Sequence, residues 1–154
     1  MLEENFINVY TKFKLAFYKK IFARFENREA TLTAVEIFCV EVIYALKKPT
    51  VQTFANFIGI SSPNATYKIN NLIKKGYVNK IQSKTDKREY HLEVSDKFLE
   101  YNGLTYDYTK TIVDRIEKRF TKEEVAQFNN FLKIISEELM CETNNLKGDD
   151  LNDK

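Results

Sequence analysis

The first 26 residues alternate between polar and large apolar side chains with the period of an α-helix. Five apolar residues follow one another at steps of three and four along this stretch: Phe6, Tyr10, Phe13, Phe17 and Ile21. This spacing places them on one face and predicts an amphipathic helix over residues 3–26. Two further phenylalanines, Phe22 and Phe25, widen the face beyond what one neighbouring helix would cover.

The sequence Thr-x-x-Glu occurs at two places where an apolar periodic pattern begins. In such a capping box, each side chain satisfies a free backbone N–H at the start of a helix. Thr33 with Glu36 predicts a helix from about residue 34 to 46, which Pro49 ends. Thr121 with Glu124 predicts the last helix, whose apolar residues are spaced as in a coiled coil.

Two shorter helical patterns occupy residues 51–76. The segment VQTFANFIG predicts a helix capped by Thr50 and ended by Gly59, which suits a left-handed C-terminal position. The segment SSPNATYKINNLIKKG predicts a second helix, with Ser61 or Ser62 as N-cap. Gly76 ends this helix. Its apolar side chains fall on one side: Ala65, Ile69, Leu72 and Ile73.

The segments YVNKIQ and EYHLEV read as two strands joined by the turn SKTDKR, which predicts a β-hairpin. Ser95 then caps a long helix. The fold class that follows is mainly α with a small β-hairpin wing. Helix, tight connection, helix and hairpin form the order of a winged helix-turn-helix lobe, which here lies between long helices.

Charge is distributed unevenly along the chain. Residues 47–90 hold nine Lys or Arg and two acidic residues, a net charge of +7, so the rest of the chain carries −5 of the total of +2. A basic middle between acidic flanks indicates that one segment contacts a polyanion. A solvated, lysine-rich surface is the ordinary alternative.

The second helix of the pair offers polar side chains that can hydrogen-bond base edges and phosphates in the major groove of double-stranded DNA. The helix N-terminus also presents backbone N–H groups that suit a phosphate. The predicted DNA-binding residues of this segment are Ser61, Ser62, Asn64, Thr66, Tyr67, Lys68, Asn70, Asn71 and Lys74.

The hairpin turn is predicted to contact DNA beside this helix. Arg88 is expected to enter the minor groove, where negative potential favours a long planar cation. Asp86 is expected to accept the Arg88 guanidinium and hold it along the wing. Lys84 and Lys87 are expected to add unspecific phosphate contacts.

The run FANFIGISSPNATYKINNLIKKGYVNKIQSKTDKREYHLEVS resembles the MarR family of bacterial transcription regulators. The match lies in the combination of a leucine/alanine helix, a pattern ending in Lys-Gly-(Leu/Tyr)-Val, and a wing with Asp-x-Arg. The positions that match are Ala55, Ser61, Leu72, Lys75, Gly76, Val78, Asp86 and Arg88. The chain departs from the family at Phe98, which stands where the family often has glycine.

The resemblance implies one domain over residues 1–142, with dimerisation helices at about 3–26 and 95–141 and the winged lobe at about 33–94. A polar, disordered tail is expected at 143–154. It also implies a homodimer that acts as a repressor on an inverted-repeat operator. The acidic N-terminus MLEENF, which lacks a basic and then apolar signal region, predicts a cytoplasmic location. Some family members release DNA when a small aromatic effector enters a cleft, which Tyr10, Phe13, Phe17 and Tyr101 would line here; these residues are also ordinary core candidates.

Other kinds of site find little support in the sequence. A single histidine, His91, makes a His-rich zinc site improbable and is expected to be exposed on a strand, and Cys39 lies among apolar residues as a structural thiol. Cys141 has no neighbours that mark it as a sensor. We therefore expect no metal, no cofactor, no catalytic residues and, without a long apolar segment, no membrane partner.

Two alternatives to a DNA-binding regulator differ in class. A winged-helix protein–protein interaction module would use the same basic face on an acidic partner, and would form no saturable complex with DNA. A small enzyme would need a nucleophile–base pair or a phosphate loop, and the sequence contains neither pattern.

Overall fold

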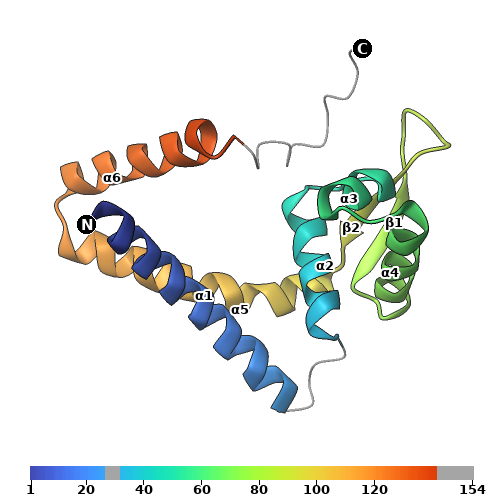
Figure 1. Ribbon diagram of the computed structural model, residues 1–154, viewed down its shortest axis with the longest axis horizontal. Helices are drawn as coiled ribbons and strands as arrows, with labels where there is room; N and C mark the ends of the chain where they lie inside the picture. The colour runs from blue at the N-terminus through green and yellow to red at the C-terminus, as the bar shows by residue number, and fades with distance from the viewer. Residues whose placement is uncertain (27–31, 142–154) are drawn as a thin grey trace. The chain divides into compact units, whose positions relative to one another are not determined.

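The computed structural model describes residues 1–26 and 32–141, apart from the side chains of residues 24–26 and 101–105. The predicted tail at 143–154 lies outside the described residues. Figure 1 shows the elements in chain order: α1 (Leu2–Glu26), α2 (Ala34–Ala45), α3 (Val51–Ile58), α4 (Ser62–Lys74), β1 (Val78–Gln82), β2 (Tyr90–Val94), α5 (Asp96–Arg119) and α6 (Lys122–Ile134). This mainly α order with one hairpin confirms the predicted fold class. The last helix differs from expectation by widening into a π-helical turn at Ile135–Leu139.

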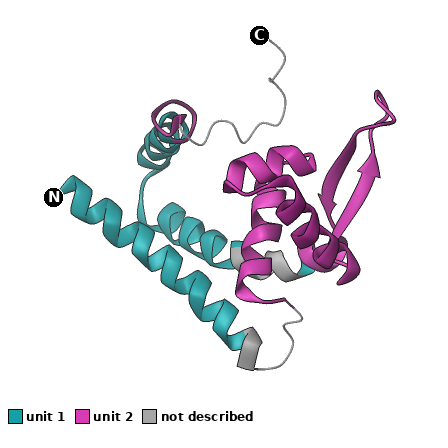
Figure 2. Cartoon of the chain, turned by 45° about the vertical axis from the view of Figure 1, so that its right-hand side comes forward, with its two compact units in different colours: residues 1–31, 100–135 teal, residues 32–99, 136–154 magenta. Residues whose placement is uncertain are grey.

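The chain forms two compact units (Figure 2). Unit 1 comprises residues 1–31 and 100–135, and unit 2 comprises residues 32–99 and 136–154. The helix α5 begins in unit 2 and continues in unit 1. The predicted winged lobe, about 33–94, lies within unit 2. None of the described helices is both long and apolar enough to cross a membrane.

Local signals place the helices of unit 2. Thr33 and Glu36 form the predicted capping box of α2, and Thr50 caps α3 by accepting the backbone N–H of Thr53. Gly59 ends α3 with a φ of 70°, a left-handed conformation that costs other residues more than glycine. These helices bury a shared apolar core whose largest side chains are Ile37, Ile43, Leu46, Phe54, Ile69, Leu72, Leu92 and Phe98.

The hairpin is antiparallel, with Val78 paired to Val94 at its base and Gln82 paired to Tyr90 near the turn. The middle of β2 is held against the loop after α2, because Leu92 donates its backbone N–H to the Pro49 carbonyl at 2.8 Å. The His91 ring nitrogen Nδ1 lies 3.0 Å from the Lys48 carbonyl. His91 is half-buried there, which corrects the expectation of an exposed histidine.

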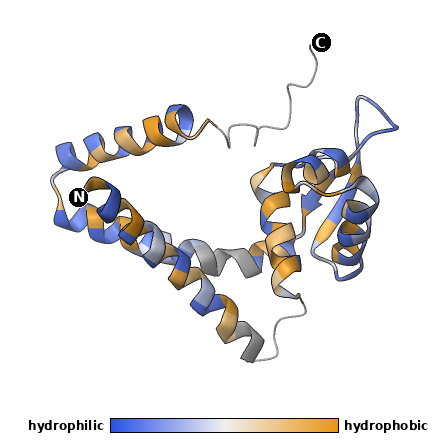
Figure 3. Ribbon diagram, viewed as in Figure 1, coloured by the Kyte–Doolittle hydropathy of each residue, from blue (hydrophilic) through white to orange (hydrophobic). Residues whose placement is uncertain are grey.

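Unit 1 leaves much of its apolar surface uncovered. The ring of Phe13 packs edge-on against Tyr108 with centroids 5.5 Å apart, yet none of the described residues of α6 is buried. Figure 3 shows hydrophobic positions recurring along α1 and α6. The large exposed side chains on these helices are Leu2, Phe6, Ile7, Val9, Tyr10, Leu15, Tyr18, Phe22, Phe128, Phe131 and Leu132. A stable monomer rarely exposes so many apolar side chains together.

Candidate nucleic-acid interface

The helix α4 is buried on one face and exposed on the other, as its spacing predicted. Ala65, Ile69 and Leu72 have at most 1% exposure and anchor the helix in unit 2. The opposite face presents polar groups to solvent and carries no acidic residue. Its exposed members among the predicted DNA-binding residues are Ser61, Asn64, Thr66, Tyr67, Asn70 and Lys74.

Three predicted residues of α4 are only half-exposed: Ser62, Lys68 and Asn71. Lys68 lies close enough to Cys39 of α2 for its positive charge to favour the thiolate form of that residue. Burial dominates there and raises the pKa of Cys39 above its ordinary value, which keeps the thiol protonated. A protonated, buried thiol is a weak nucleophile, which agrees with the expected structural role of Cys39.

The N-terminus of α4 keeps backbone donors available. Ser61 is the N-cap by its extended conformation, but its side chain makes no capping hydrogen bond. Pro63 in the first turn removes one N–H that would otherwise need a partner. The uncapped amides of the first turn, together with the helix dipole, favour an anion at this end.

Sequence reasoning missed two residues of α3: Gln52, which contacts the first turn of α4, and Asn56, which binds Gln52. The Ser62 hydroxyl donates a hydrogen bond to Gln52 Oε1 at 2.7 Å, and Gln52 Nε2 donates to Asn56 Oδ1 at 2.7 Å. Gln52 and Asn56 stand four positions apart, a spacing at which helical side chains meet. That spacing was the available signal.

The C-terminal end of α4 is fixed by residues far away in sequence. Lys75 Nζ forms an ion pair with Glu36 Oε2 at 2.8 Å. Ser95 Oγ donates to the Gly76 carbonyl at 2.7 Å, and Lys97 Nζ donates to the Lys75 carbonyl at 3.0 Å. Cations and donors at a helix C-terminus satisfy its free carbonyls and complement the dipole. The exposed face of α4 is therefore held at both ends by side chains from α2, α3 and α5.

The Glu36–Lys75 pair makes a stability prediction with a definite pH dependence. Burial alone would raise the pKa of Glu36, but hydrogen bonds from Lys75 and Thr33 outweigh it, and the pKa lies below its ordinary value of 4.5. When folding lowers the pKa of a carboxyl group, the group stabilises the folded protein at any pH above its pKa in the unfolded chain. This contribution is lost as pH falls through its pKa in the folded protein. Glu36→Gln should therefore lower the free energy of unfolding by about 0.5–1 kcal/mol at pH 7.

Urea unfolding of the wild type and Glu36→Gln between pH 7 and pH 3 measures this. Glutamine still fits the capping box, so the variant isolates the charge. The difference between the two proteins should shrink below about pH 4.5, and should be smaller in a Lys75→Met background, where only the hydrogen bonds from Thr33 still favour the charged Glu36. A difference that stays constant down to pH 3 would contradict the assignment.

The hairpin turn is organised by its own hydrogen bonds. Ser83 donates its N–H to the Glu89 carbonyl at 2.9 Å, and Glu89 donates to the Asp86 carbonyl at 3.0 Å. Asp86 Oδ1 accepts the backbone N–H of Arg88 at 2.8 Å. Among the described residues, Asp86 forms no ion pair with the Arg88 guanidinium, so the orienting contact stays a prediction. The carboxylate closes a local turn, as aspartate side chains commonly do two residues along the chain.

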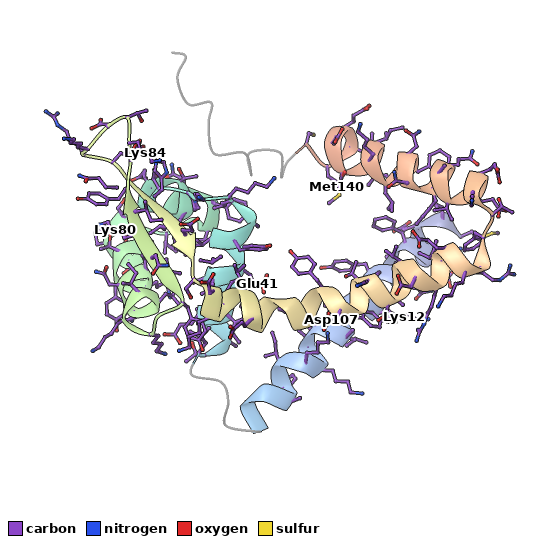
Figure 4. The ribbon with its side chains drawn as sticks, turned by 180° about the vertical axis from the view of Figure 1, so that it is seen from behind. Lys12, Glu41, Lys80, Lys84, Asp107 and Met140 are labelled. Atoms are coloured by element: carbon purple, nitrogen blue, oxygen red, sulfur yellow. The ribbon has the colours of Figure 1, made fainter. Side chains whose placement is uncertain are left out.

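Cations gather on the hairpin (Figure 4). Lys80 lies on β1 with Nζ 4.7 Å from the centre of the Tyr90 ring, and Lys84 lies in the turn. Lys84, Lys87 and Arg88 are exposed, and none of the three forms an ion pair with any residue in the described ranges. Their charges are therefore available to an external polyanion.

The predicted effector-binding residues are placed only in part. Tyr10 is 60% exposed on α1, whereas Phe13 and Phe17 are half-buried within unit 1. Tyr101 lies in α5, but its side chain is outside the described residues. Within residues 1–26 and 32–141, no three His, Cys, Asp or Glu side chains gather into a group that could hold a metal ion.

Comparison with known proteins identifies the lobe. Residues 32–90, from the end of the α1–α2 connection to the start of β2, match the family model described as MarR family. The winged lobe of this chain is therefore similar to the MarR family over residues 32–90. No curated protein matches the chain in sequence.

Solved MarR-type structures share the fold of almost the whole chain. FabT from Streptococcus pneumoniae, in complex with DNA, is 21% identical with a TM-score of 0.59, covering 91% of this chain and 96% of that one. A MarR family protein from Bacillus stearothermophilus is 12% identical with a TM-score of 0.63, covering 90% and 93%. The transcriptional regulator Tm0710 from Thermotoga maritima is 17% identical with a TM-score of 0.55, covering 90% and 96%. At these identities the likeness establishes the fold, which includes the long helices outside the matched lobe.

Proposed function

We propose that this protein is a homodimeric transcription regulator of the cytoplasm, which represses its targets by binding an inverted-repeat operator in double-stranded DNA. One observation carries the proposal. A lobe similar to the MarR family presents the acid-free polar face of α4 beside a hairpin turn with three unpaired cations, among the described residues. In such a lobe, α4 enters the major groove and the hairpin turn lies along the neighbouring minor groove.

Dimerisation is supported by the surface of unit 1. The exposed aromatic side chains of α1 and α6, such as Phe6 at 58% and Phe131 at 50%, need a cover that the rest of the described unit does not supply. A second copy supplies it with a two-fold axis, and two α4 helices then meet one DNA face about one turn apart. An aromatic effector bound near Tyr10, Phe13, Phe17 and Tyr101 remains a prediction from the family resemblance.

A mobility-shift titration tests the proposal, with DNA from upstream of the protein's own gene and with sites selected from a random pool. A discrete, saturable complex that survives unrelated competitor DNA is expected, with one dimer bound per inverted repeat. Sedimentation should find a dimer at micromolar concentration. A monomer at that concentration, or binding to an acidic protein without any saturable DNA complex, would reject the proposal.

The two lysines of the hairpin turn carry a prediction about salt. Changing both Lys84 and Lys87 to alanine should weaken binding to all sequences alike, because phosphate contacts read no base. The slope of log Kd against log salt should flatten by about 1 for each phosphate that a subunit no longer neutralises. Titrations at four salt concentrations measure this slope. A weakening confined to the selected operator, with an unchanged slope, would show that these lysines read sequence.

A further inference from the structure

The contact between α3 and the first turn of α4 fixes the direction of a hydrogen bond. Ser62 Oγ donates to Gln52 Oε1 at 2.7 Å, and the Gln52 amide is itself oriented by donating from Nε2 to Asn56 Oδ1 at 2.7 Å. A serine hydroxyl has one proton and two lone pairs. With that proton directed to Gln52, Ser62 presents only acceptor capacity to a partner beyond it.

This network is poorly explained by stability alone. All of its hydrogen bonds are solvent-exposed, where water competes and the net contribution is small. The packing of α3 on α4 already rests on buried apolar side chains, among them Phe54, Ala55 and Ala65 at 0% exposure. A serine in the first turn of a helix could instead satisfy local backbone groups, yet Ser62 reaches across to another helix.

The groups of this network that remain free to bind DNA are an acceptor on Ser62 and donors on Gln52 and Asn56. Ser62 offers an acceptor, and in the major groove the donors are the N6 amino group of adenine and the N4 amino group of cytosine. Phosphate oxygens are acceptors only, so Ser62 cannot hydrogen-bond a phosphate while it donates to Gln52. The Gln52 amide keeps one N–H, and the Asn56 amide has no acceptor partner among the residues described, so both offer donors that suit a phosphate.

We propose that Gln52 holds the Ser62 hydroxyl as an acceptor, so that Ser62 selects an exocyclic amino group of adenine or cytosine, while Gln52 and Asn56 bind the neighbouring phosphate. Gln52 is a positioning residue in this scheme, and Ser62 is a specificity-determining one. The inference rests on the proposed DNA-binding function. It adds a chemical class of base edge and a link between base readout and backbone contact.

The test uses the operator selected from a random pool and removes one amino group at a time. Each adenine is replaced by purine, and each cytosine by 2-pyrimidinone, and Kd is measured by fluorescence anisotropy at fixed salt. For the wild type, Kd should rise about 2- to 10-fold when the amino group is removed at one position of each half-site, which is the value of one hydrogen bond. Ser62→Ala should bind the intact operator more weakly than the wild type does. Removing the amino group at that position should not weaken its binding further, while removals at all other positions should change its Kd as they change that of the wild type.

Two variants of Gln52 separate positioning from binding. Gln52→Leu releases the Ser62 proton, so the hydroxyl can donate as well as accept, and discrimination at the same position should fall. Gln52→Glu keeps an acceptor for Ser62 and should retain discrimination, while its charge beside a phosphate lowers affinity for all sequences alike. Because these side chains are exposed, urea midpoints should match the wild type.

The outcomes separate the proposed function from the readout by Ser62. A wild type without any saturable DNA complex would overturn the proposed function, and the role of Ser62 with it. A wild type that binds, but shows no position silenced by Ser62→Ala, would overturn the readout by Ser62 alone. Discrimination in Gln52→Leu equal to that of the wild type would overturn the positioning role of Gln52.

Discussion

Replacing Phe98 by alanine is expected to lower the free energy of unfolding by about 3–5 kcal/mol, the usual cost of removing a buried phenylalanine. The side chain has 0% exposure in unit 2, at the start of α5. Its ring packs against Tyr44 of α2 with centroids 5.9 Å apart and an interplanar angle of 61°. Alanine would remove the buried area and this edge-on packing, and would leave a cavity between α2 and α5.

Urea titrations at one protein concentration measure the effect, because a dimer makes apparent stability depend on concentration. Phe57→Ala is the matched control, since Phe57 lies in the same unit but is 45% exposed. The free energy of unfolding of this control should fall by about 1 kcal/mol or less. Equal losses in the two variants would show that Phe98 is not part of the core.

Phe98 also shows why a departure from a family pattern was hard to interpret. It occupies the position where the MarR family often has glycine, and the sequence alone gave no partner for such a large ring. The partner is Tyr44, more than fifty positions earlier, so the contact depends on tertiary packing. The residue that departs from the pattern is one of the largest fully buried side chains of the lobe.

Signals within a few residues predicted most of the fold. The capping boxes at Thr33 and Thr121 form as expected, and Gly59 and Gly76 take φ values of 70° and 80° where helices end. These features depend on backbone groups close in sequence, so local chemistry decides them. The exposed face of α4 followed from periodicity for the same reason.

The candidate site was less predictable because its side chains are oriented by distant or competing partners. Lys75 pairs with Glu36 across 39 positions, and Lys97 reaches the Lys75 carbonyl across 22. Asp86 had two partners within reach, the Arg88 guanidinium and the Arg88 backbone N–H, and the backbone donor is the one it binds. Sequence shows which groups are available, whereas the fold decides which of them meet.

Arg88→Ala is expected to weaken operator binding by about 1–3 kcal/mol, roughly 5- to 150-fold in Kd, with little change in stability. The side chain is exposed, and forms no ion pair with a described residue, so its removal should leave the lobe intact. A guanidinium in a narrow minor groove gains from the negative potential there and from its planar fork of donors. Anisotropy titrations at fixed salt, on the selected operator and on unrelated DNA, measure the change in Kd.

Variants of the neighbouring residues isolate what Arg88 contributes. Lys87→Ala removes the same charge from the same turn, so a minor-groove role predicts a larger operator-specific loss of affinity for Arg88→Ala than for Lys87→Ala. Arg88→Lys should recover binding to unrelated DNA more fully than binding to the operator. Asp86→Asn should bind nearly as the wild type does, because an amide oxygen can also accept the Arg88 backbone N–H, whereas Asp86→Ala should weaken binding by loosening the turn. Equal losses of affinity for Arg88→Ala and Lys87→Ala on every sequence would reduce Arg88 to one more phosphate contact.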